Sequence, residues 1–154
     1  MTTQVTKTVL VNVPVSRAYN QWTQFEEFPS FMEGVEEVTQ EDEKHLHWVA
    51  EIAGVRREWE ADITEQHPDE RIAWTSTTGM KNAGVVTFHR IEEDRTRVML
   101  QLDIEPDDVV EKVGDALGFV RRRATGDLKR FKEMIESRGT ASGEWRGDVA
   151  RPNP

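Results

Sequence analysis

The stretch PDDVVEKVGDALGFVRRRATGDLKRFKEMIESR, residues 106–138, decides the fold that the sequence predicts. Its apolar residues recur at steps of three and four, which is the spacing of one helical face. Pro106 suits the first position of a helix, and Gly139 suits the left-handed residue that ends one. At about 1.5 Å per residue the helix is about 50 Å long, so it needs a large apolar partner. The apolar positions are Val109, Val113, Ala116, Leu117, Val120, Ala124, Leu128, Phe131 and Ile135.

Length and composition indicate one acidic globular domain. The chain has 154 residues, no cysteine, a formal net charge of -9 and a mean hydropathy of -0.67. The negative charge argues against nucleic-acid binding, because phosphates need a basic surface, and against general adhesion to anionic membranes. No apolar run approaches the length of a transmembrane helix or of a signal peptide. We therefore expect a cytoplasmic protein without stable membrane insertion.

The chain before the long helix predicts strands and two short helices. Residues 4–13 place four valines on one face, as a strand does, and residues 14–24 show helical spacing. The aromatic segment 25–32 predicts a second short helix or a turn. The period then falls to two, and the joints carry turn residues too few for a crossover helix, so consecutive strands should pair antiparallel. The six predicted strands are 34–42, 44–52, 55–66, 70–77, 82–91 and 95–104.

Together these elements predict an α+β helix-grip fold. A curved seven-stranded antiparallel sheet would wrap around the long C-terminal helix and bury the apolar faces of both. The two short helices would follow the first strand. This domain is expected to span residues 1–138, and residues 139–154, rich in Gly, Pro and small polar residues, are expected to form a disordered tail in which Trp145 is mobile.

Strand alternation places Trp48, Trp59 and Trp74 on neighbouring inward faces. One interpretation is a plain aromatic core, and the other is an apolar cavity between sheet and helix that opens near residues 25–32. The sequence does not decide between them. The candidate ligand-binding residues lie on the inward strand faces, in the aromatic segment or on the helix: Phe28, Phe31, Met32, Trp48, Arg57, Trp59, Trp74, Ser76, Phe88, Leu100, Leu117 and Gly118.

Arg57 stands out because it shares the inward face of Trp59. A guanidinium is almost never buried without a partner. Arg57 therefore either reaches water near the end of its strand or meets an anionic or carbonyl group of a ligand. Gly118 and Gly114 flank the apolar stripe of the helix, where they indicate either close packing against the sheet or room for a ligand.

Other chemistry is poorly represented, and we expect neither a metal nor a cofactor. His45 and His47 share an outward face, but no third metal ligand is evident. Ser76 faces inward with no histidine on its own or an adjacent inward face, so a nucleophile is weakly supported. There is no glycine-rich phosphate loop. The run Arg121 to Arg123 is interpreted as the polar back of the helix.

Several segments of the chain resemble the START-like helix-grip superfamily, which includes polyketide cyclases/dehydrases, Bet v 1-type proteins and ubiquinone-binding proteins. The segments are VNVPVSRAYNQWTQFEEFPSFM (11–32), ERIAWTSTTG (70–79), GVVTFHRI (84–91) and TRVMLQLDIEP (96–106). The resemblance covers about residues 3–137 and implies the same fold. In the cyclases of this superfamily, polar cavity residues that include an arginine are proposed to steer a polyketide chain. Arg57 is the residue here that matches this role best, with Ser76 second.

Three functions remain open. The first is binding of a hydrophobic small molecule, such as a lipid, an isoprenoid quinone or a polyketide, by a non-catalytic carrier or sensor. The second is a polyketide cyclase/dehydrase-type enzyme in which Arg57 polarises a substrate carbonyl. The third is an interaction or stress-related module with a residual cavity. No inward histidine or carboxylate stands ready as a general base, which favours binding over catalysis.

Overall fold

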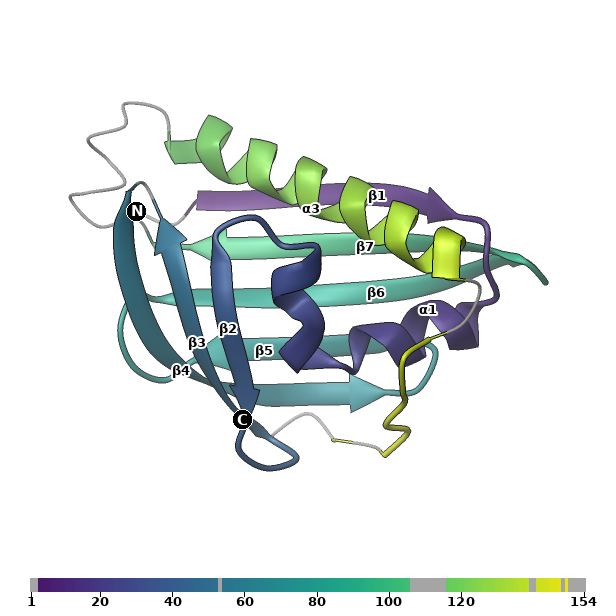
Figure 1. Cartoon of the computed structure of the whole chain (residues 1–154), viewed down its shortest axis with the longest axis horizontal. Coiled ribbons are helices and arrows are strands. Elements are labelled where there is room, and N and C mark those ends of the chain that lie inside the picture. Colours follow the sequence, from purple (N-terminus) through teal and green to yellow (C-terminus); the bar gives the residue numbers. More distant parts are fainter. Residues whose placement is uncertain (1–2, 53, 106–115, 139–140, 148, 150–154) are drawn as a thin grey trace.

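A computed structural model describes residues 3–52, 54–105, 116–138, 141–147 and 149. Its centre is one sheet that curves around a long helix (Figure 1). The sheet has seven antiparallel strands in the order β1-β7-β6-β5-β4-β3-β2. The α+β helix-grip architecture predicted from the sequence is thereby confirmed. The strands are β1 (Thr3–Val11), β2 (Val35–Gln40), β3 (His45–Ile52), β4 (Val55–His67), β5 (Arg71–Ser76), β6 (Asn82–Glu92) and β7 (Arg95–Ile104).

Consecutive strands from β2 to β7 pair as neighbours, as their short connections require. The first strand instead pairs with the last, in a register that runs from Thr3 opposite Ile104 to Val11 opposite Thr96. The Thr96 hydroxyl is buried and donates a hydrogen bond of 2.9 Å to the carbonyl of Val13. This bond gives the Thr96 hydroxyl and the Val13 carbonyl a partner at the point where the chain leaves β1 and turns toward the first helix.

The helix α3 (Ala116–Arg138) lies across the concave face of the sheet (Figure 1). The helix expected from residue 106 is described from Ala116 onward, and residues 106–115 lie outside the described residues. Its buried side chains follow the spacing of three and four that the sequence shows. They are Val120, Ala124, Leu128, Phe131 and Ile135.

Two short helices follow β1, namely α1 (Val15–Trp22) and the 3-10 helix η1 (Phe25–Ser30). They are joined to α3 by aromatic side chains. The indole of Trp22 packs edge-on against Phe131 of α3, with ring centroids 4.9 Å apart, and also contacts Phe31 at 5.6 Å. Edge-to-face aromatic contacts add to the stabilisation from burial. This cluster therefore fixes α1 and η1 against one end of the helix.

Residues 141–147 run back along α1 and bring Val149 against β4. The backbone N–H of Trp145 donates to the Thr23 hydroxyl at 3.1 Å. Gln66 and Val149 exchange two backbone hydrogen bonds of 2.9 and 2.7 Å, and both side chains are buried. The mobility expected for residues 139–154 from composition stays a prediction. The division of the chain at residue 139 stays a prediction.

Among the described residues, no helix is both long and apolar enough to cross a membrane.

Truncation after Thr140 should lower the thermal midpoint by about 5 °C. It removes Val149 together with its backbone pairing to Gln66 and exposes the Gln66 side chain, a loss of about 2 kcal/mol, and each kcal/mol shifts the midpoint of a domain this size by a few degrees. Differential scanning calorimetry measures the change. Glu144→Ala, at an exposed position of the same segment, is the control and should leave the midpoint unchanged. An unaltered midpoint in the truncated protein would show that these contacts contribute no stability.

Candidate functional site

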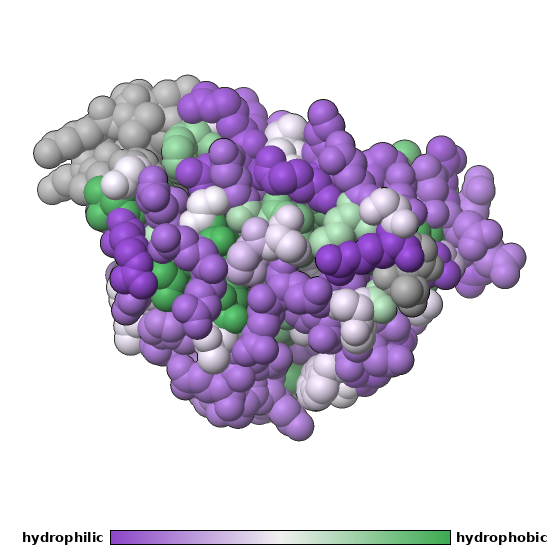
Figure 2. Space-filling model, viewed as in Figure 1, coloured by the Kyte–Doolittle hydropathy of each residue, from purple (hydrophilic) through white to green (hydrophobic). Residues whose placement is uncertain are grey.

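An apolar cavity of about 140 Å³ lies between the sheet and α3. Hydrophobic atoms also reach the surface near β2 and β3 and beneath α3, between hydrophilic side chains (Figure 2). Strands β3 and β7 contribute three lining residues each, β2, β4, β5 and β6 contribute one each, and α3 closes the other side. The lining residues are Met32, Glu33, Val35, Trp48, Ala50, Ile52, Trp59, Trp74, Met80, Asn82, Leu100, Leu102, Ile104, Phe119, Val120, Arg123 and Asp127.

Three tryptophans form one wall of the cavity. Trp48 and Trp59 are opposite each other on β3 and β4, and their rings stack with centroids 5.7 Å apart and planes 8° apart. The ring of Trp74 lies 6.5 Å from that of Trp48. The aromatic core and the apolar cavity that the sequence left as alternatives therefore coexist, because the indoles pack on each other and still border free volume.

Gly84 allows the indole of Trp74 to lie over β6. The two residues are opposite each other in the β5–β6 register. A Cβ atom at position 84 would lie 2.4 Å from Cζ2 of the indole, which is far inside van der Waals contact. A glycine is thus required at this point for the wall of the cavity to take its observed shape.

The size of the cavity limits what it holds without rearrangement. A dry cavity of about 150 Å³ is known to accommodate benzene. The volume here therefore suits one ring or a short branched chain. A second, more open groove of about 420 Å³ lies next to it and shares Met32, Glu33, Val35 and Arg123 with it. The cavity and the groove are therefore neighbours on either side of these four residues.

Polar contacts hold the segment between η1 and β2 against α3, beside the cavity. The Arg123 guanidinium donates to the Glu33 carbonyl at 2.7 Å and lies 3.5 Å from the Glu33 carboxylate. The backbone N–H of Glu33 donates to Asp127 Oδ1 at 2.9 Å. Arg130 donates to the Phe31 carbonyl at 2.8 Å and to Asp127 Oδ1 at 2.6 Å. Three side chains from successive turns of α3 therefore anchor the rim.

Asp127 is the most perturbed acid of this rim. Burial raises the pKa of its carboxyl group, while the hydrogen bonds from the Glu33 N–H and from Arg130 act in the opposite direction. The net pKa is above the ordinary value of 3.8. A partly buried carboxyl group with a raised pKa that lines a cavity beside a guanidinium is a candidate functional pair.

Some residues predicted from the sequence line this cavity, namely Met32, Trp48, Trp59, Trp74 and Leu100. Others pack in the aromatic core away from the lining: Phe28, Phe31 and Phe88 are all buried. Gly118 is half-buried in α3 next to the lining residue Phe119. The side chain of Leu117 lies outside the described residues. Participation of any of these residues in ligand binding stays a prediction.

The two polar candidates lie elsewhere. Arg57 is half-buried on β4 opposite Ala50, and it is not among the described residues that line the cavity. Ser76 uses its hydroxyl to accept a hydrogen bond of 3.0 Å from the backbone of Asn82, which closes the β5–β6 connection. Neither residue is at the cavity surface, so a role for either toward a ligand stays a prediction.

Sequence reasoning missed the polar rim. Arg121 and Arg122 are exposed as expected, but Arg123 lines the cavity, so the interpretation of the whole run as the helix back is wrong for Arg123. The position of Arg123 around the helix could have indicated this. Arg123 is adjacent to the buried Ala124, and it lies four residues before Asp127, so the two side chains share one face of the helix. Ala50, Ile52, Leu102 and Ile104 also line the cavity; strand alternation places them on the inward faces of β3 and β7, but they were not among the candidate ligand-binding residues.

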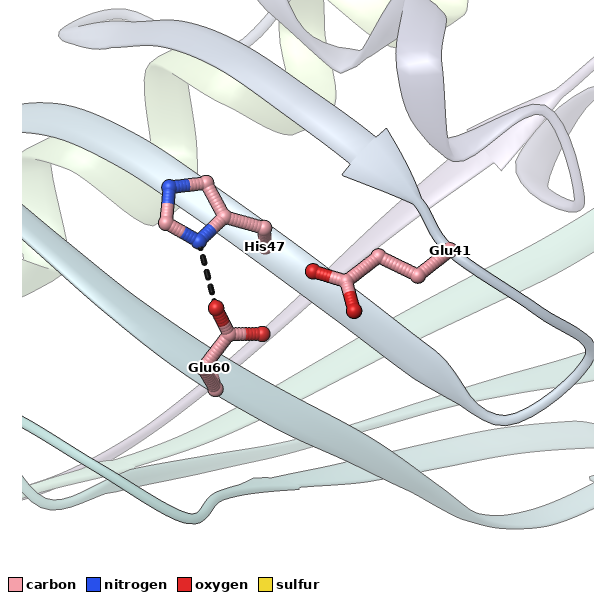
Figure 3. A group of neighbouring side chains, drawn as sticks. All are labelled: Glu41, His47 and Glu60. Carbon is pink, nitrogen blue, oxygen red and sulfur yellow. Dashed lines mark hydrogen bonds and ion pairs between the residues drawn. The ribbon is translucent and has the colours of Figure 1, made fainter.

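A second cluster lies on the outer face of the sheet (Figure 3). His47 Nδ1 is 2.7 Å from the Glu60 carboxylate on the neighbouring strand, and one donor atom from each of Glu41, His47 and Glu60 lies within 4.8 Å of the others. The carboxylates of Glu41 and Glu60 are potential metal ligands beside His47 that strand alternation alone did not reveal. The hydrogen bond to Glu60 raises the pKa of His47 above its ordinary value of 6.5. The expectation that this protein has no metal site stays a prediction.

His47→Gln should destabilise the protein more at pH 5.5 than at pH 8.5. The folded-state pKa of His47 is raised, so its charged pair with Glu60 contributes fully below pH 6.5 and is lost as the pH rises through the folded-state pKa. Urea unfolding of both proteins across this range measures the difference. His89→Gln, which removes an exposed histidine from β6, is the control and should run parallel to the original protein. A constant difference for His47→Gln would contradict the ion pair.

Gly84→Ala should destabilise the protein by about 1–3 kcal/mol, because the added methyl group displaces the Trp74 indole from a close-packed position. Chemical denaturation measures this loss, and a changed near-UV circular dichroism spectrum would report the moved indole. Gly126→Ala adds the same methyl group to α3, where the Arg130 guanidinium must shift by a few tenths of an ångström, and the gain in helix propensity offsets this cost, so its effect should be smaller than that of Gly84→Ala. Equal effects of the two changes would argue against the packing of Trp74 on Gly84.

A protein of Streptomyces lincolnensis is similar to this chain along nearly its whole length. The chain is 57% identical over 147 residues to an uncharacterized 17.2 kDa protein of Streptomyces lincolnensis, and the alignment covers 95% of this chain and 98% of that protein. Near-complete coverage at this identity indicates that the two proteins share one fold throughout.

Solved structures with the same architecture include several of bacterial origin. A Deinococcus radiodurans protein, DR_A0006, is 28% identical with a TM-score of 0.69, covering 88% of this chain and 98% of that one. The ZhuI aromatase/cyclase of Streptomyces sp. R1128 gives a TM-score of 0.74 at 17% identity, covering 94% and 100%. A START superfamily protein of Mycobacterium smegmatis gives 0.66 at 17% identity, covering 88% and 95%. Residues 11–133 match the family described as polyketide cyclase/dehydrase and lipid transport, and the chain belongs to that family.

Proposed function

We propose that this protein is a non-catalytic carrier or sensor that binds a hydrophobic small molecule between the sheet and α3. Membership of the family supports a ligand-binding or cyclase role in general. The observation that favours binding is the cavity itself, which is walled by three tryptophans and by aliphatic side chains. Burial of an apolar ligand against such a wall is favourable by about 25 cal/mol for each Å² removed from water.

The dimensions of the site favour a ligand with a compact apolar end. One ring fills the cavity, and the remainder of a longer molecule extends past Met32 and Val35 into the outer groove. The rim supplies polar groups where such a molecule would emerge into water. This arrangement suits a lipid, an isoprenoid quinone or a polyketide-like molecule better than a sugar or a nucleotide, whose many polar groups would lose water without compensation.

A cyclase or dehydrase-type enzyme is the second candidate. The observation that favours it is the pair Asp127 and Arg123, since both residues line the cavity and the pKa of Asp127 is raised. A protonated carboxyl group can donate a proton, and a guanidinium can polarise a carbonyl. Arg123 replaces Arg57 as the cation best placed for this purpose. Binding remains the preferred function, because Asp127 Oδ1 is already occupied by two hydrogen bonds.

Native mass spectrometry of freshly purified protein, with organic extraction, tests the proposal directly. We expect an adduct of one apolar molecule for each chain, recovered unchanged in the organic phase. A bound molecule that is chemically converted during incubation, with loss of conversion in Asp127→Asn, would favour the enzyme instead. An unliganded mass, together with no saturable binding of any apolar probe, would contradict both candidates.

Leu102→Trp should weaken binding of ethylbenzene at least tenfold, because the larger side chain fills free volume in the cavity that Leu102 lines. Saturation-transfer NMR with titrated ethylbenzene measures the affinity. Leu10→Trp makes the same change at an exposed position of β1 away from the cavity, and it should bind like the original protein. Equal affinities for all three proteins would place the bound probe elsewhere.

A further inference from the structure

Three side chains that can ligate a metal come together on the outer face of the sheet, namely Glu41, His47 and Glu60 (Figure 3). One donor atom of each lies within 4.8 Å of the others, and no other histidines and acidic residues that the structure describes meet in this way. His47 and Glu60 alternate along their strands with Trp48 and Trp59, which line the cavity. The cluster therefore lies on the other face of the sheet and is independent of the proposed function.

Strand pairing brings the three residues together. His47 is directly opposite Glu60 in the β3–β4 register, and its Nδ1 atom is 2.7 Å from the Glu60 carboxylate. On the other side His47 is opposite Thr39 of β2, and Glu41 follows two residues later, which is the spacing of side chains on one face. The Glu41 N–H donates to the His45 carbonyl at 2.9 Å and so fixes the backbone of Glu41 beside β3.

The spacing of the donor atoms suits one ion after small movements of the side chains. In a tetrahedral site with bonds of about 2.1 Å, two ligand atoms lie about 3.4 Å apart. The His47–Glu60 pair would therefore widen by about 0.7 Å, and two bonds to the ion would replace its hydrogen bond. Glu41 is exposed, and the other two side chains are half-buried. The carboxylates can thus turn without disturbing the core, and water can reach the remaining position.

The charges of the cluster also favour a cation. The carboxylates of Glu41 and Glu60 repel each other at this separation. Within the part of the chain that the structure describes, neither of them forms an ion pair with a lysine or an arginine. Glu58, on the same face of β4, differs because Arg56 pairs with it at 3.1 Å. A divalent cation would neutralise the two carboxylates that have no such partner.

The set of donors indicates the kind of ion. An imidazole nitrogen suits zinc, copper, iron and nickel, whereas magnesium and calcium prefer oxygen atoms throughout. We propose that Glu41, His47 and Glu60 bind one divalent transition-metal ion of the zinc type, with water completing its coordination. The ion would connect the end of the edge strand β2 to β3 and β4 and would stabilise the folded protein. This proposal runs against the absence of a metal expected from the sequence.

Isothermal titration calorimetry of the chelator-treated protein with Zn²⁺ tests the site. We expect saturable binding of Zn²⁺ that weakens at least tenfold in each of Glu41→Gln, His47→Gln and Glu60→Gln, since loss of even an outer-shell partner has an effect of this size. Zn²⁺ should also raise the thermal midpoint of the original protein and not that of His47→Gln. Mg²⁺ should bind much more weakly than Zn²⁺, because it does not use the imidazole.

His45→Gln is the matched control. His45 lies on the same face and also contacts two carboxylates, but Asp42 is 2.6 Å from its Nδ1 atom and Asp62 is 3.4 Å from its Nε2 atom. One ion cannot join both carboxylates through a single nitrogen of this ring, so the variant should bind Zn²⁺ like the original protein. Glu58→Gln removes an equal charge from the same face, and it should change the affinity far less than Glu60→Gln does.

The outcomes are distinct. No binding of Zn²⁺, or unchanged affinity in the three ligand variants, would overturn the proposal. An equal loss in His45→Gln or Glu58→Gln would show a general effect of the acidic surface and would also overturn it, as would binding of Mg²⁺ as tight as that of Zn²⁺. If a variant does not fold, substoichiometric Co²⁺ decides the question in the original protein. It should broaden the ¹⁵N–¹H signals of Glu41, His47 and Glu60 first, and broadening centred elsewhere would contradict the site.

Discussion

The burial of one face of α3 is the constraint on which the rest of the structure depends. The helix carries its apolar side chains as a single stripe, and only a surface that curves can cover a stripe along such a length. The sheet supplies that surface, with β1 paired to β7 so that the first and last strands lie together beneath the helix. The aromatic contacts of Trp22 with Phe31 and Phe131 then complete the cover at one end. The cavity is the part of the concave face that this packing leaves unfilled.

Most of the fold could be predicted from local patterns. Alternation in strands and spacing in helices depend on neighbouring residues, so the predicted strand 44–52 and the observed β3 (His45–Ile52) agree closely. The pairing of β1 with β7 was beyond such patterns, because it joins residues about one hundred positions apart. The course of residues 141–147 was also beyond them. That segment is held by backbone hydrogen bonds and by small polar side chains, which leave no periodic apolar signal in the sequence.

The tryptophan wall of the cavity could be predicted from the sequence, whereas the polar rim formed by Arg123, Asp127 and Arg130 could not. Trp48, Trp59 and Trp74 were recognised because three large apolar residues alternate inward on adjacent strands. Arg123 was not, because the edge of a helical stripe is ambiguous by about one residue and a guanidinium suits either side of that edge. Its partner Glu33 is ninety residues away, and no spacing rule connects them. Arg57 shares a face with Trp59 but is not among the described residues that line the cavity, and its role toward a ligand stays a prediction.

The polar rim also bears on how quickly a ligand is exchanged. The segment from Phe31 to Glu33 is attached to α3 through Arg123, Asp127 and Arg130, and it lies where the cavity meets the outer groove. Under the proposed binding role, a molecule that enters between this segment and the helix would need these contacts to separate, so its residence time would depend on their opening rate. The pair of Arg123 with Glu33 is partly exposed, and salt screens such pairs. Ionic strength would thereby alter the dwell time of a bound molecule even where it leaves the equilibrium affinity of the apolar cavity unchanged.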